Sequence, residues 1–217
     1  MRSQNADYLN DSQVIEETHI CPWQIVRLFD NFLRPLVHNP RKLFGPYVRR
    51  GMKVLDVGCG RGFSSLGLAQ LVSEDGLVIS ADIQTEMLDM VKKRAARAGL
   101  SNRIRTHRCT VERIGVREEL DFAVAFFMLH EVPDVRAFLT EIFTLLKPAG
   151  RLFIAEPKIH VSRRDFENIV MLAQAVGFEI SERPSIRIGR TVVLVKGVAV
   201  GEDNTGNTRV MGNFKFE

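Results

Sequence analysis

Two hydrophobic patterns alternate along the middle of this chain. Short apolar runs, typical of strands buried in a sheet, are separated by stretches in which apolar residues recur every three or four positions, as on one face of a helix. This alternation predicts a parallel sheet with helices on both faces and right-handed crossovers. The predicted strands are Lys53–Val57, Leu77–Asp82, Arg103–His107, Asp121–Phe127 and Arg151–Ala155; the predicted helices are 62–72, 86–98, one after Asp134, and 163–176.

Residues that start or stop elements predict the flanking structure. Pro40 near its beginning and Gly51 at its end predict a helix over 40–50. Two further strands, 178–186 and 191–196, are close enough in sequence to pair antiparallel. Asp134 and Ser162 are predicted N-caps, Gly99 and Gly177 are predicted helix stops, and Lys147–Gly150 is predicted to end the helix before it and turn into the fifth strand.

The first 39 residues are predicted to form an N-terminal arm and helical cap. Residues 1–18 are polar and unpatterned, whereas 19–38 show helical spacing and hold the only tryptophan, Trp23. Two interpretations stay open: the segment 19–38 covers a binding cleft, or it packs on the outside of the sheet. The main domain is then 40–197, and 198–217 is predicted to be a flexible C-terminal tail.

Composition limits the location and the partners. The 217 residues carry a net charge of +4, too small to indicate a nucleic-acid partner, and no apolar run reaches membrane-spanning length. The first residues lack the apolar core of a signal peptide, and Cys21, Cys59 and Cys109 form neither a disulfide framework nor a zinc-spaced set. We expect a cytoplasmic protein with no metal site and no membrane span, and the oligomeric state stays open.

Three glycines at alternate positions follow the first predicted strand. In the run Val54-Leu-Asp-Val-Gly-Cys-Gly-Arg-Gly62 they lead directly into a predicted helix. Glycine permits a tight turn and lets a ligand lie against the main chain, and the first N–H groups of the helix attract an anionic group. Asp56 precedes the turn, and Asp82 ends the next strand, where a carboxylate can bind ribose hydroxyls. We therefore expect a nucleotide-like cofactor.

The spacing G-x-G-x-G differs from the G-x-G-x-x-G of dinucleotide-binding proteins. Together with Asp56 and Asp82 it resembles the first and second motifs of the class I S-adenosylmethionine-dependent methyltransferases. The resemblance covers about residues 40–197 and implies an α/β fold: a Rossmann-like, doubly wound, seven-stranded and mostly parallel sheet with an antiparallel last strand. It also implies that Asp56 faces the methionine ammonium and that Asp82 binds the ribose.

Further cofactor contacts are expected where later strands end. By the resemblance, Ile83 packs on the adenine face, and backbone carbonyls near Phe126 or Phe127 receive the methionine ammonium. The family often has an acid for the adenine amino group where this chain has Cys109 or Thr110, so a main-chain or hydroxyl contact is expected there. The predicted cofactor-binding residues are Asp56, Gly58, Cys59, Gly60, Gly62, Asp82, Ile83, Cys109, Thr110, Val111, Phe126 and Phe127.

Catalysis is predicted at the ends of the fourth and fifth strands. His130 either removes a proton from the nucleophile or bonds to the backbone of the next helix. Burial lowers an imidazole pKa, whereas Glu131 or Glu156 nearby raises it, so the sequence leaves the direction open. Glu156 acts as a base, holds a cationic substrate, or braces the loop. The predicted catalytic residues are His130 and Glu156, and the predicted substrate residues are Trp23, His130, Glu131, Glu156 and His160.

The motifs favour methyl transfer to a small molecule. The fourth strand end lacks the Asn/Asp-Pro-Pro-aromatic tetrad and the Pro-Cys pair of nucleic-acid methyltransferases, so no nucleic-acid partner is expected. Leu129-His130-Glu131 and Leu146–Gly150 resemble segments of ubiquinone/menaquinone C-methyltransferases and arsenite methyltransferases. The implied cofactor is S-adenosylmethionine. The alternatives are a catalytically inactive S-adenosylmethionine-binding regulatory or scaffold protein and a nicotinamide oxidoreductase.

Overall fold

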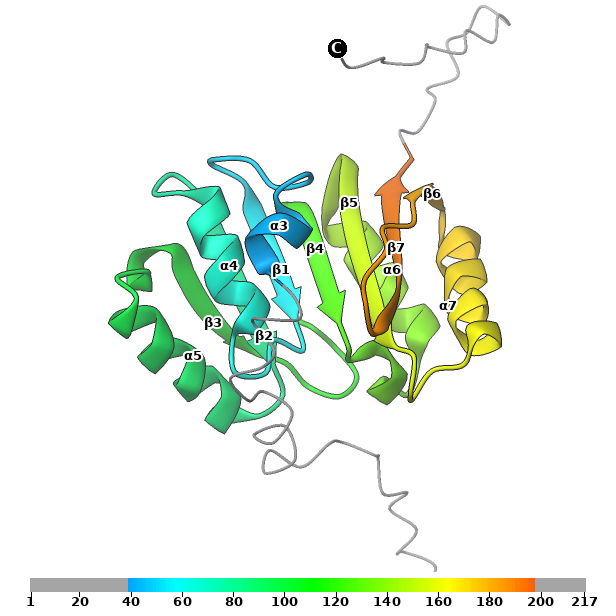
Figure 1. Ribbon diagram of the computed structural model, residues 1–217, viewed down its shortest axis with the longest axis horizontal. Coiled ribbons are helices and arrows are strands. Elements are labelled where there is room, and N and C mark those ends of the chain that lie inside the picture. The colour runs from blue at the N-terminus through cyan, green and yellow to red at the C-terminus, as the bar shows by residue number, and fades with distance from the viewer. Residues whose placement is uncertain (1–38, 198–217) are drawn as a thin grey trace, which may run out of the picture.

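A computed structural model describes residues 39–197, so the predicted N-terminal cap with Trp23 and the predicted tail 198–217 lie outside the described residues. A seven-stranded sheet of order β3-β2-β1-β4-β5-β7-β6 runs through this part of the chain (Figure 1). Only β7 runs antiparallel to its neighbours, which confirms the predicted fold. The strands are β1 Lys53–Val57, β2 Leu77–Asp82, β3 Ile104–Arg108, β4 Leu120–Phe126, β5 Leu146–Pro157, β6 Phe178–Glu182 and β7 Gly189–Lys196.

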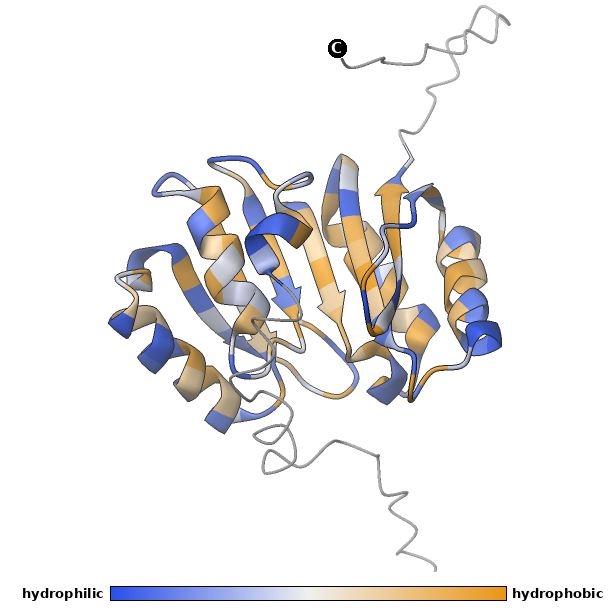
Figure 2. Cartoon of the chain, viewed as in Figure 1, coloured by the Kyte–Doolittle hydropathy of each residue, from blue (hydrophilic) through white to orange (hydrophobic). Residues whose placement is uncertain are grey.

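Helices cover both faces of the sheet, because side chains along each strand alternate between the faces. In β1, Val54 packs in one core cluster with Phe44, and Leu55 packs in another with Ile142. The central strand β4 is correspondingly apolar along most of its length (Figure 2). The first face carries α3 Pro40–Phe44, α4 Phe63–Val72 and α5 Thr85–Arg97, the second carries α6 Val135–Leu145 and α7 Arg163–Val176, and η1 Ser101–Arg103 and η2 Leu129–Glu131 are short 3₁₀ turns.

The predicted caps are confirmed. The Asp134 carboxylate accepts a hydrogen bond from Ala137 N at the start of α6. The Ser162 hydroxyl accepts one from Asp165 N at the start of α7. Gly177 ends α7 in the left-handed conformation, with φ +118°. The side chains of Asp134 and Ser162 thus fix where α6 and α7 begin.

The predicted helix over 40–50 was wrong beyond Phe44. Gly45 still has helical dihedral angles, with φ −54° and ψ −36°, but the next residue, Pro46, has no N–H to continue the helical hydrogen bonds, so α3 stops after five residues. The chain beyond it turns inward. Tyr47 is buried and stacks on Phe122 with 5.9 Å between ring centroids.

Several predicted boundaries shift. The strand β5 begins at Leu146, directly after α6, so Lys147–Gly150 belongs to the strand instead of a turn, with Ala149 at φ +62°. The strand predicted over 178–186 ends at Glu182, since Pro184 has no N–H to give to a strand ladder. The strand β7 then begins two residues earlier than predicted, at Gly189, which pairs with Pro157.

The parallel strands bring their carboxyl ends to one edge of the sheet, the lower edge in Figure 1. The chain leaves β1 toward β2 on one side, while β4 lies on the other side of β1. Ligands of open α/β sheets bind beside such a switch in strand order. A ligand site is therefore expected between the ends of β1, β2 and β4.

Candidate active site

A cavity of about 650 Å³ opens at this edge. Its walls come from the ends of β1 to β4, the segments that follow these strands, and the first turns of α6. Most of the predicted site residues line it together: Asp56, Gly58, Cys59, Gly60, Asp82, Ile83, Cys109, Thr110, Val111, Phe126, Phe127 and Glu131. The predicted residues Gly62, His130, Glu156 and His160 are not among the lining residues, and Trp23 lies outside the described part of the chain.

The glycines of the turn differ in what surrounds them. Gly58 and Gly60 both have positive φ angles, of +63° and +50°. A methyl group added at Gly58 would lie 2.7 Å from Met128 Cγ, whereas one added at Gly60 would meet no atom within 4 Å. At Gly62 it would lie 3.0 Å from a methyl of Val91. Gly58 and Gly62 thus permit close packing of the protein, and Gly60 leaves the backbone open toward a ligand.

Asp82 connects the two turns beside the cavity. Its carboxylate accepts hydrogen bonds from Gly60 N and Gln84 N, both at 2.9 Å. Burial raises the pKa of the carboxyl, and these backbone N–H groups oppose that rise. Each carboxylate oxygen has a second acceptor site. Asp82 is therefore held in place with acceptor capacity left for a ligand hydroxyl.

Two serines that were not predicted from the sequence hold Asp56 in place, Ser65 directly and Ser80 through Ser65. Ser65 Oγ in α4 donates to Asp56 Oδ2 at 2.5 Å, and Ser80 Oγ in β2 donates to Ser65 Oγ at 2.8 Å. All three side chains are buried. The one signal in the sequence is that Ser65 and Ser80 occupy positions where the apolar pattern calls for core residues.

Two buried cysteines line the cavity: Cys109 follows β3, and Cys59 follows β1. Burial, followed by the negative charges of Asp82 and Glu141, raises the pKa of Cys109 to about 12. Burial likewise keeps the pKa of Cys59 well above its ordinary value. Both thiols therefore stay protonated at neutral pH and serve as small apolar groups.

Glu141, on α6, also lines the cavity and was missed by sequence analysis. Its carboxylate accepts hydrogen bonds from Ile114 N at 3.0 Å and Gly115 N at 2.8 Å, which holds the segment after β3 against α6. The sequence gives no signal for this role, because Glu141 reads as an ordinary polar position of an amphipathic helix.

Phe127, at the end of β4, is in a strained conformation. Its φ of +60° is unfavourable for a bulky side chain, at a cost of about 1–3 kcal/mol. The backbone N–H of Phe127 donates to Ala155 O at 2.8 Å, and its ring lies 4.4 Å from that of Phe126. The strained residue turns the chain out of β4 into η2, and both Phe126 and Phe127 line the cavity there.

His130 and Glu156 form a pair next to this wall. Glu156 Oε2 lies 2.5 Å from His130 Nδ1, and Glu156 Oε1 accepts a hydrogen bond from Leu129 N at 2.8 Å. His130 Nε2 lies 3.9 Å from Glu131 Oε1, and Glu131 lines the cavity. The hydrogen bond to Glu156 raises the pKa of His130 above its ordinary value, although burial opposes it. The ring of His160 stacks on that of His130, with 5.8 Å between centroids.

This geometry refines the prediction for Glu156. Its side chain is completely buried instead of lying at the mouth of the cavity. Since a carboxylate only accepts hydrogen bonds, His130 Nδ1 carries the proton in this pair, and the lone pair of the neutral ring lies on Nε2. Glu156 therefore orients His130, and Nε2 is the atom available to take up a proton.

Comparison with known proteins identifies the family. Residues 49–186 match the family model described as a methyltransferase domain. The chain belongs to the methyltransferase family. This match, with the strand order described above, confirms the class I S-adenosylmethionine-dependent family and its cofactor.

The relatives include quinone-biosynthesis enzymes. The ubiquinone/menaquinone biosynthesis C-methyltransferase of Cronobacter sakazakii is 32% identical over 137 residues, which are 63% of this chain and 53% of that protein. Its counterpart from Erwinia tasmaniensis is 30% identical over 179 residues, covering 78% of this chain and 68% of that protein. The chain thus spans about half the length of the first of these curated relatives and about two thirds of the second.

Among solved structures, an S-adenosylmethionine-dependent methyltransferase from Aquifex aeolicus superposes with a TM-score of 0.71. The sequences are 23% identical, and the alignment covers 80% of this chain and 98% of that one. At this level of identity the match supports the fold alone. It agrees with the strand order described above.

The cavity of this methyltransferase fits the family cofactor. A volume of about 650 Å³ is within the ordinary range for small-molecule sites, and the open space at Gly60 admits a ligand against the backbone. The lining carries carboxylates on several elements and one arginine, Arg113, which suits the cationic sulfonium and ammonium groups of S-adenosylmethionine. These carboxylates are Asp56, Asp82, Glu112, Glu131, Asp134 and Glu141.

Two features are absent from residues 39–197. In this range no group of three or more His, Cys, Asp or Glu side chains is arranged to hold a metal ion. Nor does any helix in the same range have the length and apolarity needed to cross a membrane.

Proposed function

We propose that the protein transfers the methyl group of S-adenosylmethionine to a small, uncharged acceptor with an apolar body. The observation that carries the proposal is the His130–Glu156 pair beside the aromatic end of a cavity whose other strand ends fit the cofactor. Phe126, Phe127 and Met128 provide an apolar wall there. The acceptor is proposed to bind against this wall.

The cofactor supplies an activated methyl group, so the protein needs to align a nucleophile with it and exclude water. Asp82 and Asp56 hold the cofactor, and the phenylalanines shield the reacting atoms. His130 Nε2 takes the proton from an acceptor hydroxyl or an acidic carbon. Glu156 keeps the ring in the required tautomer and stabilises the imidazolium that forms.

The charge of the cavity limits the acceptor. Six lining carboxylates against one arginine disfavour an acceptor that is itself an anion. The names of the relatives favour an aromatic ring related to the quinones, methylated on carbon. We therefore propose a neutral hydroxylated ring as the acceptor class.

This proposal is tested by mass spectrometry after incubation with S-adenosylmethionine and matched pairs of hydroxylated rings, one neutral and one carboxylated in each pair. Methylation of the neutral member is expected, with little or none on the carboxylated one. Transfer restricted to the carboxylated member would contradict the proposed acceptor class. Tight cofactor binding without transfer to any acceptor would instead favour the inactive, regulatory alternative.

A further inference from the structure

Two neighbouring segments next to the cavity carry an unusual combination of charge and exposed apolar side chains. They are 157–164, which follows β5, and 183–190, which leads into β7; together we call them the basic rim. Their cationic residues are Lys158, Arg163, Arg164, Arg183, Arg187 and Arg190, and neither segment contains an Asp or a Glu.

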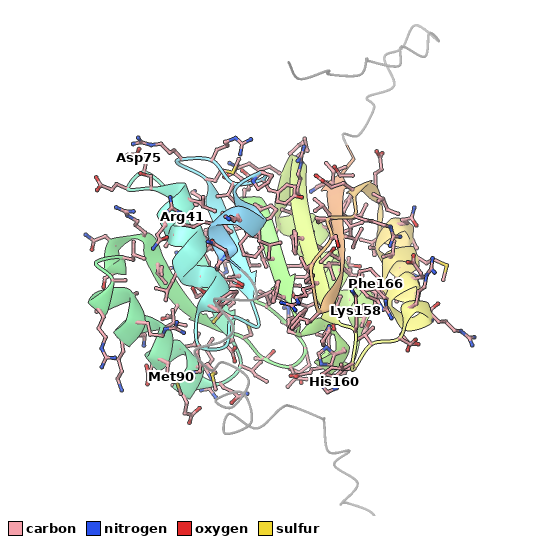
Figure 3. All side chains as sticks on the ribbon, viewed as in Figure 1. Arg41, Asp75, Met90, Lys158, His160 and Phe166 are labelled. Atoms are coloured by element: carbon pink, nitrogen blue, oxygen red, sulfur yellow. The ribbon has the colours of Figure 1, made fainter. Side chains whose placement is uncertain are left out.

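The two segments form one surface. Lys158 N donates to Ile188 O at 3.0 Å, and Arg190 Nε donates to Val161 O at 3.3 Å. Gly189 lies against Phe127, since a methyl group added there would be 2.9 Å from its ring. The basic rim therefore continues the wall of the cavity, and Figure 3 places Lys158 and His160 at the same edge of the sheet.

Apolar side chains project from this basic surface. Ile159 is 79% exposed, the highest value among the large hydrophobic residues of the described chain, and Ile188 is 48% exposed. Exposing a branched aliphatic side chain to water is unfavourable, and two of them on segments joined by a backbone hydrogen bond mark a contact surface more strongly than one.

Only some of the positive charges of the basic rim are compensated by acidic side chains within the protein. Arg183 is paired with Glu167 through both guanidinium nitrogens, so its charge is largely compensated. Lys158, Arg163, Arg164 and Arg187 are exposed. Arg163 and Arg164 occupy the first turn of α7, where the helix dipole disfavours cations. Asp165 is the one acidic residue of that turn, and Lys158 Nζ donates to Arg187 O at 3.4 Å. The basic rim thus keeps an excess of exposed positive charge, which a negatively charged partner would match.

We propose that the basic rim docks on a surface of anionic phospholipid. The cations meet the headgroups, and Ile159 and Ile188 insert at the boundary with the acyl chains, as the apolar positions of interfacial segments do. Nucleic acid, the other polyanionic partner, would use the cations and leave two isoleucines exposed. Docking in this way turns the mouth of the cavity toward the lipid, so an apolar acceptor can enter without crossing water.

The test is co-sedimentation of the full chain with vesicles of phosphatidylcholine alone and of phosphatidylcholine with phosphatidylglycerol. We expect binding only to the second kind, weakened by added salt. The double variants Ile159→Asp/Ile188→Asp and Lys158→Glu/Arg187→Glu should each lower the vesicle partition coefficient at least about tenfold. The matched controls Met171→Asp/Ile180→Asp and Lys93→Glu/Arg97→Glu, which change exposed residues outside the rim, should retain it.

Several outcomes would overturn the proposal. They are no binding of the full chain to the anionic vesicles, equal losses in rim and control variants, and capture of a single-stranded oligonucleotide that Ile159→Asp/Ile188→Asp leaves unchanged. Binding of S-adenosylhomocysteine is measured on the same variants. It should stay at the wild-type level, so a failure of the docking surface is distinguished from a failure of the proposed reaction.

Discussion

The two sides of the cavity are built in different ways. At β1 and β2 the site consists of a glycine turn and two carboxylates, which accept hydrogen bonds from Ser65 Oγ and Gly60 N, 9 and 22 positions away along the chain. At β4 and β5 it depends on contacts between residues 26 and 27 positions apart, from Glu156 to His130 and Leu129. The first side suits a cofactor shared by a family, and the second can vary with the acceptor. Substitutions on the first side should therefore weaken cofactor binding, and substitutions on the second side should slow methyl transfer.

The largest effect is expected at His130. Replacing it with Gln keeps a hydrogen-bonding side chain and should lower kcat about 10²–10⁴-fold, the usual contribution of a positioned base. Affinity for S-adenosylhomocysteine should change little, because His130 is proposed to contact the acceptor and not the cofactor. Steady-state kinetics with the acceptor and calorimetry with the product check both parts. Full activity in this variant would reduce His130 to a structural brace.

Replacing Asp82 is expected to affect cofactor binding directly, in contrast to replacing His130. The variant Asp82→Ala loses charge-assisted hydrogen bonds to the ribose and should weaken S-adenosylhomocysteine binding by about 1–3 kcal/mol. It should remain folded, although the turns that Asp82 connects become looser. An unchanged dissociation constant in calorimetry would reject the ribose assignment.

Gly60 offers a comparison with a matched control. Gly60 and Gly51 both have positive φ angles, and an added methyl group meets no atom within 4 Å at either position. Gly60→Ala and Gly51→Ala should thus lose similar amounts of stability, about 1–2 kcal/mol. Only Gly60→Ala should weaken S-adenosylhomocysteine binding, because Gly60 lines the cavity and Gly51 does not. Equal affinities in the two variants would show that the ligand does not lie on this turn.

The smallest effect concerns pH. The folded pKa of His130 is raised above the unfolded value of about 6.5. Its pairing with Glu156 therefore stabilises the fold fully below pH 6.5, and that stabilisation is lost as the pH rises through the folded pKa. The stability difference between wild type and His130→Gln should shrink over this window in denaturant titrations. The acid limb of the rate profile should correspondingly lie above pH 6.5 in the wild type and vanish in the variant.

The sequence predicts the parts of the fold and the site that have local signals, and it misses those that depend on packing. The motif from Asp56 to Gly62 is contiguous, and Asp82 ends a strand of clear pattern, so the cofactor side and the sheet follow from local signals. Glu141 acts on a segment 26 and 27 residues before it, and Ser65 reaches Asp56 only once α4 packs on β1. The strain at Phe127 likewise has no sequence signature. Long-range contacts of this kind arise from packing, which a pattern of single residues does not encode.

The central claim is that the cavity at the carboxyl edge binds the S-adenosyl cofactor, and calorimetry on the wild-type chain tests it most directly. S-adenosylhomocysteine should bind with one-to-one stoichiometry and raise the melting temperature, as mass action requires for a ligand of the folded state. NAD, titrated at the same concentrations, should give neither signal. Binding of NAD with no response to S-adenosylhomocysteine would contradict the account.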